Sequence, residues 1–370
     1  MALSPHQQVY EIIEKSNNPL ITFGKNFNGD TIASSLAVAE LLKKMGKKAD
    51  IVSADFNLPE NYQFLSDASN IKNVLSGHKE LAISINLAES EAPHLSQKTE
   101  DGYLHIIVKP QNGKMAKEHV KISDFNYIHD LIITLNTPDL EALDHVFHDN
   151  SDLFYQVPII NIDHLPENEH YGQINLVNIR ATSASEIIYD LIEKLDANLI
   201  DESIATLLLT GMIEKTKSFR NPIVTPRSLN TASLLMAAGA ERDSIIKNLY
   251  QTKTVNTLRL WGKLLLKLQT DTYQKIAWAG ITEKDFQETN SRPLDIYGVI
   301  DELIVNIPTV ELSALFYEYN QNIFCLIKSE KQIDLRERFR KYNPTGNKHL
   351  IHFELTVPSE EIIRELKSLI

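Results

Sequence analysis

Apolar and polar positions follow two different periods along the first half of the chain. Between about Pro19 and Leu195, short apolar runs are separated by longer stretches in which apolar residues recur every three or four positions. The first pattern is typical of buried strands and the second of helices. The predicted strands are PLITF, KADIVS, DLIITLN and VPIINID, and the predicted helices include SSLAVAELLKKMG and ATSASEIIYDLIEKL. Such alternation predicts an α/β fold with a mostly parallel sheet and helices on both faces.

The pattern changes further along the chain. A mostly helical stretch ends in the long apolar segment LYQTKTVNTLRLWGKLLLKLQ. Beyond it, strand-like runs such as VELSALFYEY and NIFCLIKS are separated by helical segments. We therefore expect a first domain over 1–248, a linking helix over 249–268 and a second, smaller α/β domain over 269–370.

One segment of the first domain, 77–127, does not fit this alternation. It holds two strand-like runs, LAISINL and YLHIIVK, with the polar connection AESEAPHLSQKTEDG between them. The two runs predict an inserted β-hairpin or small subdomain at the edge of the first domain. Two interpretations stay open for this insertion, a decorated surface loop and a surface that binds a protein partner.

Polar residues follow the predicted strands at the positions where an open α/β sheet binds its ligands. The candidates are Asp30, Asn136, Asp163, His164 and, after a later helix, Lys215. Each is a weak signal when taken alone. Asp30 would serve as the N-terminal cap of the helix that follows it, and an Asp–His pair most often forms a capped turn.

Taken together, four segments resemble the DHH-family phosphoesterases. They are ITFGKNFNGDTIASS, DLIITLNTPDLEALD, VPIINIDHLPENEHYGQINLVN with the following ATSASEIIYDLI, and IATLLLTGMIEKTKSFR. The third segment alone keeps more than twenty positions in register. The resemblance covers nearly the whole chain outside the insertion. It is nearest to the branch of oligoribonucleases, phosphoadenosine phosphatases and cyclic-dinucleotide phosphodiesterases, and it implies a DHH domain followed by a DHH-associated domain.

The sequence departs from this family where the family binds metal. Family enzymes hold two divalent ions, usually manganese, between carboxylates and histidines, and the ions activate a water. At five family aspartate positions this chain has Asn28, Asp30, Asn136, Asp163 and Lys215, a formal charge of −1 instead of −5. Two family histidines are also replaced, by Gly24 and Leu165.

These losses predict that the chain needs no cofactor and that Lys215 substitutes for the missing metal. On this hypothesis the Lys215 ammonium lies within about 4 Å of Asp30 or Asp163, the range of an ion pair. The alternative is that the Lys215 side chain points into solvent and forms no ion pair.

The resemblance also suggests substrate-binding positions. The family's DHH-associated domain carries a glycine-rich loop, G-G-G-H-x-x-A-A-G, that grips the substrate. The matching segment here, PTGNKHLIHFEL, keeps Gly346 alone among the glycines and has Asn347 at the histidine. Arg336 stands where the family often has an arginine, and Asn168 keeps its place in the third segment. Asn168, Arg336, Gly346 and Asn347 are therefore the candidate substrate-binding residues.

Composition narrows the choice of partners. The net charge of −12 argues against nonspecific binding of long nucleic acids, while a small anionic ligand in one pocket stays open. No apolar run approaches the roughly 20 residues of a membrane span. One cysteine and the lack of a signal peptide predict a cytoplasmic protein. The family resemblance implies a homodimer.

Three hypotheses for function follow. The first is a catalytically inactive homologue, a pseudoenzyme, that binds a nucleotide-like ligand or a protein partner at the former active site. The second is an active phosphodiesterase or phosphatase that uses one manganese ion, held by Asp30, Asp163, His164 and Glu214. The third is a scaffold without a ligand.

Overall fold

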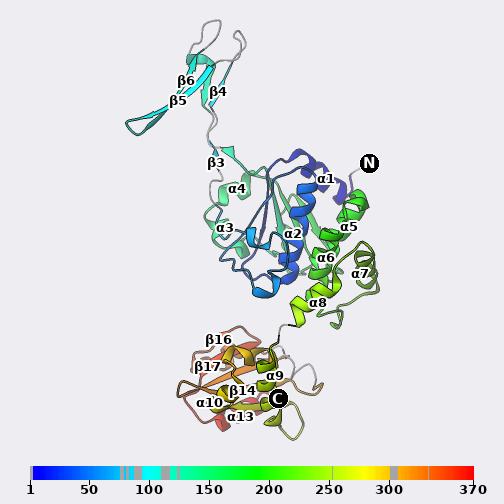
Figure 1. Ribbon diagram of the computed structural model, residues 1–370, viewed down its shortest axis with the longest axis vertical. Helices are drawn as coiled ribbons and strands as arrows, with labels where there is room; N and C mark the ends of the chain where they lie inside the picture. Colours follow the sequence, from blue (N-terminus) through cyan, green and yellow to red (C-terminus); the bar gives the residue numbers. More distant parts are fainter. Residues whose placement is uncertain are drawn as a thin grey trace. The chain divides into compact units, whose positions relative to one another are not determined.

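The computed structural model describes residues 3–75, 79–80, 83–86, 94–109, 117–122, 126–251, 253–300, 307–331 and 333–370. The chain forms two compact units, Met1–Gln251 and Thr252–Ile370. Each unit has its own sheet (Figure 1). Each also has its own apolar cores. Within the described ranges, no helix has both the length and the apolar character needed to cross a membrane.

The first unit is built around a five-stranded sheet in which all neighbouring strands are parallel. The spatial order is β11–β10–β9–β1–β2. The strands are β1 (Pro19–Phe23), β2 (Asp50–Ser53), β9 (Leu131–Leu135), β10 (Ile159–Asp163) and β11 (Ile174–Val177). Because the sheet is parallel, the carboxyl ends of all five strands lie at one edge. The predicted α/β fold is confirmed.

Helices cover both faces of this sheet. Successive residues of β1, such as Leu20 and Ile21, point to opposite faces of the sheet and belong to two different apolar cores. The core around Ile21 is closed by α1 (Pro5–Lys15), α2 (Gly29–Lys44), α5 (Ala184–Asp196), α6 (Glu202–Lys215), α7 (Pro226–Ala237) and α8 (Arg242–Tyr250). The core around Leu20 is closed by the short helices α3 (His145–His148) and α4 (Ser151–Gln156).

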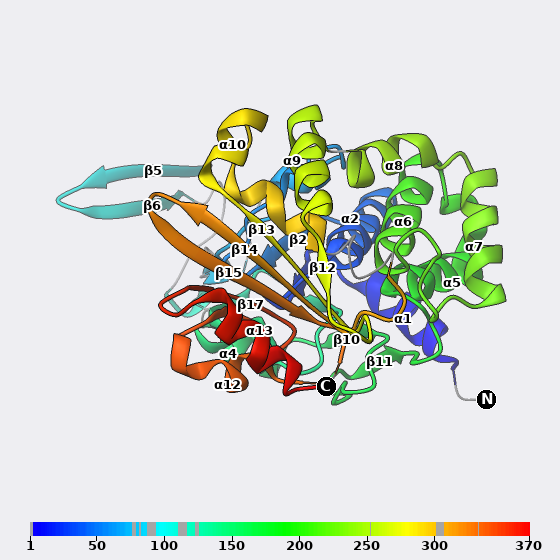
Figure 2. The same ribbon diagram turned by 90° about the horizontal axis from the view of Figure 1, so that it is seen from below.

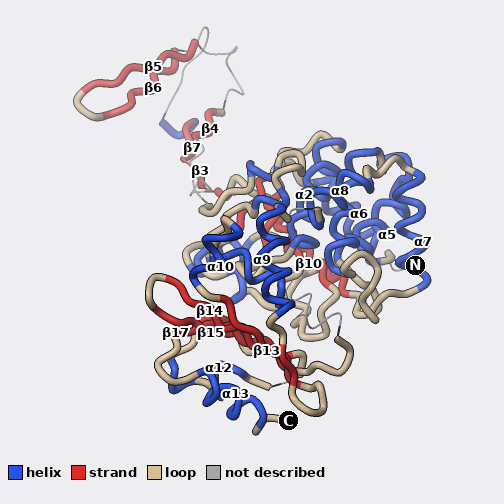
Figure 3. The backbone as a smooth tube through the Cα atoms, turned by 60° about the horizontal axis from the view of Figure 1, so that its bottom comes forward, coloured by secondary structure: helices blue, strands red, loops and turns tan. Residues whose placement is uncertain are grey.

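The second unit contains a six-stranded mixed sheet in the order β12–β13–β14–β15–β17–β16. Its strands are β12 (Gln269–Thr270), β13 (Ile276–Ile281), β14 (Leu312–Tyr319), β15 (Asn322–Ser329), β16 (Thr345–Gly346) and β17 (Leu350–Glu354). Figures 2 and 3 show α9 (Val255–Leu266) and α10 (Glu283–Thr289) on one face. The other face carries α12 (Leu335–Arg338) and α13 (Ser359–Lys367).

The described part of 249–268 contains parts of two helices instead of the single helix expected there. Helix α8 ends at Tyr250, and α9 begins at Val255 after the N-cap Thr254, whose side chain accepts a hydrogen bond from the Thr257 N–H. The buried face of α9 packs into a core of the second unit. The break arises because the threonine cap starts a new helix. Helix α9 is therefore part of the second unit.

The insertion over 77–127 also pairs differently from the prediction. The two apolar runs do not pair with each other among the described residues. Strand β6 (Tyr103–Lys109) pairs with β5 (His94–Glu100), and β4 (Ile83–Ile85) pairs with β7 (Val120–Ile122). The reason is the two-residue turn Asp101–Gly102, with φ values of 52° and 80°, a hairpin signal inside the presumed connection. A third pair joins β3 (Lys79–Glu80) and β8 (Asn126–Tyr127).

Close contact between α6 and the start of α2 depends on one glycine. A Cβ on Gly211 would collide with the Ser185 hydroxyl and would lie 2.7 Å from Asp30 Oδ1. By contrast, a Cβ on Gly262 in α9 would meet nothing within 4 Å. Both glycines lie inside helices, so a substitution at Gly262 is a suitable control for the same substitution at Gly211.

We predict that Gly211→Ala destabilises the first unit by about 1–2 kcal/mol, because overpacking outweighs the gain in helix propensity. Gly262→Ala should instead stabilise the second unit by about 0.5–1 kcal/mol. Urea unfolding monitored by far-UV circular dichroism measures the loss of stability in Gly211→Ala. Both tryptophans, Trp261 and Trp278, lie in the second unit, so their fluorescence follows the second. Stabilisation by both substitutions would contradict the close packing at Gly211.

Candidate functional site

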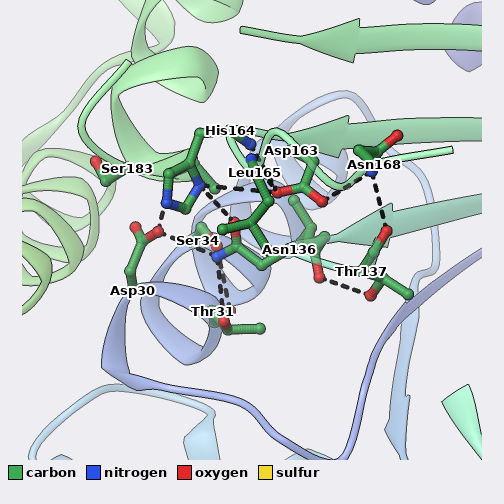
Figure 4. Close-up of polar contacts among 12 residues, drawn as sticks. Asp30, Thr31, Ser34, Asn136, Thr137, Asp163, His164, Leu165, Asn168 and Ser183 are labelled. Atoms are coloured by element: carbon green, nitrogen blue, oxygen red, sulfur yellow. Dashed lines mark hydrogen bonds and ion pairs between the residues drawn. The ribbon is translucent and has the colours of Figure 1, made fainter. Parts of the chain in front are cut away.

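Most of the candidate residues meet at the carboxyl ends of β9 and β10. Asn136 follows β9 directly, Asp163 is the last residue of β10, and His164 comes next. The first turn of α2 brings Asp30 to the same place, and Figure 4 shows these side chains directed toward one another. The sheet edge expected to bind ligands therefore holds a connected polar cluster.

The Asp30 carboxylate is fully buried, and protein donors occupy both of its oxygens. The N–H of Ala184 donates to Oδ2 at 2.9 Å, and the N–H and hydroxyl of Ser185 donate to Oδ1 at 3.1 and 2.7 Å. Asn136 Nδ2 donates to Oδ2 at 3.1 Å. A carboxylate offers about four acceptor positions, so these four donors use its capacity.

Two of these donors are backbone groups in the first turn of α5. Ser183 is the N-cap of that helix. The positive end of the helix dipole therefore faces the buried Asp30 charge and stabilises it. The expectation that Asp30 caps its own helix is wrong, because Asn28 is the N-cap of α2 and accepts from the N–H and hydroxyl of Thr31, both at 3.0 Å.

Asp163 is likewise buried and satisfied from within the protein. The N–H groups of His164 and Leu165 donate to Oδ1 at 2.7 and 3.0 Å, and Asn168 Nδ2 donates to Oδ2 at 2.8 Å. The Asn168 amide also bonds to Thr137 and Asn161 and is buried. The structure thus places Asn168, a candidate for substrate binding, inside the network that holds Asp163.

Asn136 connects the two carboxylates. Its backbone is left-handed, with φ of 48°, a conformation that asparagine tolerates better than most residues. Its Nδ2 donates to Asp30 and to Thr31 Oγ1, and its Oδ1 accepts from His164 Nδ1 at 3.0 Å. Since Nδ1 carries the proton in this bond, neutral His164 presents Nε2 as an acceptor, and that atom is buried without a partner.

Burial also sets the protonation of His164. Its pKa is lowered chiefly because burial disfavours the charged ring, and the nearby charge of Lys215 acts in the same direction. The carboxylates of Asp30 and Asp163 oppose this shift. The imidazole is therefore neutral at physiological pH.

The end of α6 brings Glu214 and Lys215 to the cluster, and it contradicts the predicted ion pair. In the described part of the chain the Lys215 ammonium makes no ion pair with Asp30 or Asp163, although the side chain is half-buried. The acceptor positions of Asp30 are already occupied by donors from α5 and Asn136. The pKa of Glu214 is raised, first by burial and second by the Asp30 charge, and its Oε2 has no hydrogen-bond partner.

The donor set does not fit two divalent ions. Hard cations need several anionic oxygens with free lone pairs, whereas the oxygens of Asp30 and Asp163 are engaged by protein donors. An amide nitrogen of Asn136 faces Asp30. Over the described ranges, no three His, Cys, Asp or Glu side chains form a group that could hold a metal ion.

The remaining candidates lie in the second unit. Arg336 is exposed on α12. Gly346 has φ of 111°, and a Cβ there would collide with the Leu350 carbonyl oxygen. Asn347 Oδ1 accepts from the N–H groups of His349 and Leu350 at 2.9 and 3.0 Å. Gly346 and Asn347 therefore form the tight turn between β16 and β17, which explains both residue types without a ligand.

Comparison with known proteins supports the fold and identifies the family. The whole fold is similar to the crystal structure of an exopolyphosphatase-related protein from Bacteroides fragilis, with a TM-score of 0.68, 16% sequence identity and coverage of 99% of this chain and 95% of that one. Residues 19–212, more than half of the chain, match the DHH family, N-terminal domain. The chain belongs to the DHH family.

Two relatives carry names that describe an activity. A Streptococcus mutans protein named probable bifunctional oligoribonuclease and PAP phosphatase NrnA is 33% identical over 115 residues, 31% of this chain and 35% of the relative. The Bacillus subtilis bifunctional oligoribonuclease and PAP phosphatase NrnA is 24% identical over 221 residues, 59% of this chain and 67% of that protein. The chain thus spans about a third of the first relative's length.

We predict that restoring a carboxylate at position 136 destabilises the fold. Asn136→Asp removes the donors to Asp30 and Thr31 and buries a second charge beside Asp30, so the free energy of unfolding at pH 7.5 should fall by about 3 kcal/mol. Asn28→Asp is the matched control, because aspartate is an equally good N-cap. Urea unfolding followed by circular dichroism measures both. Equal stability of the two variants would contradict the role of Asn136.

We predict that Glu214 makes the stability of the fold depend on pH. Its raised pKa means that the folded chain holds this proton more tightly than the unfolded chain. Stability is therefore lost as the pH rises from the ordinary glutamate value of 4.5 through the folded-state pKa. Glu214→Gln should be more stable than wild type at pH 8 and equal to it at pH 4. The exposed control Glu167→Gln should show no such difference between melting temperatures, and a flat profile for Glu214→Gln would refute the prediction.

Proposed function

We propose that this chain is a non-hydrolysing member of the DHH family whose site binds a nucleotide-like anion. The observation that carries the proposal is the saturation of Asp30, whose carboxylate accepts four hydrogen bonds from Asn136, Ala184 and Ser185. A metal ion at Asp30 would have to displace these donors, of which Ala184 and Ser185 are themselves buried. Each hydrogen bond to a charged group is worth about 1.5–3 kcal/mol, so this displacement is costly.

Charge balance supports the same conclusion. Two metal ions add four positive charges, which several carboxylates must offset. Here the carboxylates at positions 28 and 136 are replaced by amides, and the two that stay are compensated by a helix N-terminus and by backbone N–H groups. The cluster is therefore balanced without metal ions.

The ligand class rests on similarity and on charge. The names of the Streptococcus and Bacillus relatives describe them as oligoribonucleases and PAP phosphatases, with the Streptococcus name qualified as probable. Their alignments cover only part of this chain, and Lys215 adds a positive charge where the family has an aspartate. A nucleotide-like anion that is bound but not hydrolysed is consistent with both observations.

A second candidate function is a phosphoesterase that uses a single metal ion. Two buried acceptors, His164 Nε2 and Glu214 Oε2, have no hydrogen-bond partner and favour it. His164 and Glu214 would help to hold such an ion, and Asp30 or Asp163 would have to exchange a protein donor for the metal. The non-hydrolysing function needs no such exchange.

We predict that purified protein does not hydrolyse phosphoadenosine phosphate, short oligoribonucleotides or cyclic dinucleotides with manganese. Losing about 4 kcal/mol of metal stabilisation corresponds to a roughly thousandfold lower rate than that of the Bacillus subtilis relative assayed in parallel. Elemental analysis of the same sample measures bound metal. Turnover that disappears in Asp30→Ala, together with one bound ion per chain, would favour the single-metal function instead.

A further inference from the structure

The last residue of helix α6, Lys215, and the turn that follows it hold three cations within six residues, Lys215, Lys217 and Arg220, in a chain with a net charge of −12. The stretch KTKSFR contains no carboxylate. None of the three cations makes an ion pair with a carboxylate in the described part of the chain. The Arg220 Nε donates to the backbone carbonyl of Lys217 at 3.1 Å. This cationic segment, residues 215–220, therefore has positive charge that the protein does not neutralise.

Helix geometry places Lys215 beside the polar cluster. Gly211 faces Asp30 and Ser185 so closely that a Cβ would collide with the latter. Residues four apart lie on one face of a helix, so Lys215 leaves α6 one turn beyond that contact and on the same face. The charge of Lys215 also reaches His164 and Glu214.

The backbone after Lys215 is held in an uncommon conformation. Lys217, Ser218 and Phe219 have φ values of 49°, 59° and 62°, three consecutive non-glycine residues in the left-handed region. Hydrogen bonds fix this turn, from the Ser218 N–H to the Ile213 carbonyl at 2.7 Å and from the Phe219 N–H to Thr216 Oγ1 at 3.0 Å. Strained turns of this kind persist where the surroundings hold them, and they cluster at ligand-binding sites.

We propose that the cationic segment 215–220 is an anion-binding site and that its ligand is a phosphate group, bound without a metal ion. This inference rests on the proposed function and names the binding element of that site. Lys215 is half-buried and its ammonium has no ion-pair partner in the described part of the chain, and a phosphate oxygen would supply that partner. Lys217 and Arg220, both exposed, would contact the remaining oxygens.

A structural role for Lys215 is the alternative. Lysine in the last turn of a helix stabilises the helix dipole, and Lys215 occupies that position in α6. Lys15 occupies the same position in α1 and is exposed. The dipole role predicts similar behaviour for the two lysines, whereas the anion site predicts that Lys215 alone affects ligand binding.

The test is binding of inorganic phosphate, adenosine 5′-monophosphate and adenosine to the full chain in EDTA. It uses isothermal titration and thermal stabilisation. Wild type should bind phosphate and the monophosphate but not adenosine. Lys215→Ala should weaken binding at least about tenfold, Lys217→Ala and Arg220→Ala about threefold each, and Lys15→Ala not at all. Lys215→Arg keeps the charge and should bind within about threefold of wild type, with circular dichroism confirming that each variant folds.

The outcomes separate this proposal from the proposed function. Tighter binding of the monophosphate than of phosphate would identify a nucleotide as the ligand, and equal binding would identify the phosphate group alone. Equal binding by wild type and Lys215→Ala would overturn the anion site at 215–220 and leave the proposed function intact. Absence of any binding, with or without manganese, would overturn the anion site and also the anion-binding part of the proposed function. Binding that requires manganese would overturn both, because it would put a metal ion in the site.

Discussion

The buried carboxylate of Asp30 is the constraint around which the first unit is arranged. A charge with no exposed surface is stable only where the protein supplies donors in place of water. The N-terminus of α5 supplies three of them, two N–H groups and the Ser185 hydroxyl. This interaction fixes α5 against α2, and the absence of a side chain at Gly211 lets α6 pack against both.

The rest of the cluster follows from that arrangement. Because Asp30 uses its acceptors on α5, its remaining need is one donor, which the Asn136 amide provides. The amide oxygen in turn orients His164, and the backbone after β10 satisfies Asp163. The asparagine at 136 and the inward hydrogen bonds form one consistent set. In the chemistry of the DHH family such carboxylates face metal ions, whereas here they face amides and N–H groups.

The two ends of the cluster differ in charge. At the sheet edge the carboxylates of Asp30 and Asp163 have hydrogen-bond partners within the protein, while the cations of segment 215–220 make no ion pair with a carboxylate among the described residues. The polar cluster at the sheet edge is thus closed by hydrogen bonds, and positive charge is concentrated on one neighbouring segment. In the second unit the turn formed by Gly346 and Asn347 is explained by its own backbone, so that its residue types alone do not indicate a ligand.

Local features were accessible from the sequence. The periods of the apolar residues predicted the parallel sheet and its helices, and the spacing of four segments identified the family, because both depend on residues close together in the chain. The Asp101–Gly102 turn was equally local, and its dipeptide is a hairpin signal that the polar character of the surrounding connection masked. The break between α8 and α9 at Thr254 is a local signal of the same kind.

The partners of the charged residues were decided by the tertiary structure. Asp30 receives its donors from residues 154 and 155 positions away, and the sequence assigned it instead to the nearest helix terminus or to Lys215. Spacing along the chain cannot show which of several possible donors forms a hydrogen bond with a buried oxygen. That choice depends on how α5, α6 and the carboxyl ends of β9 and β10 pack, because hydrogen bonds form only over about 3 Å and in narrow directions.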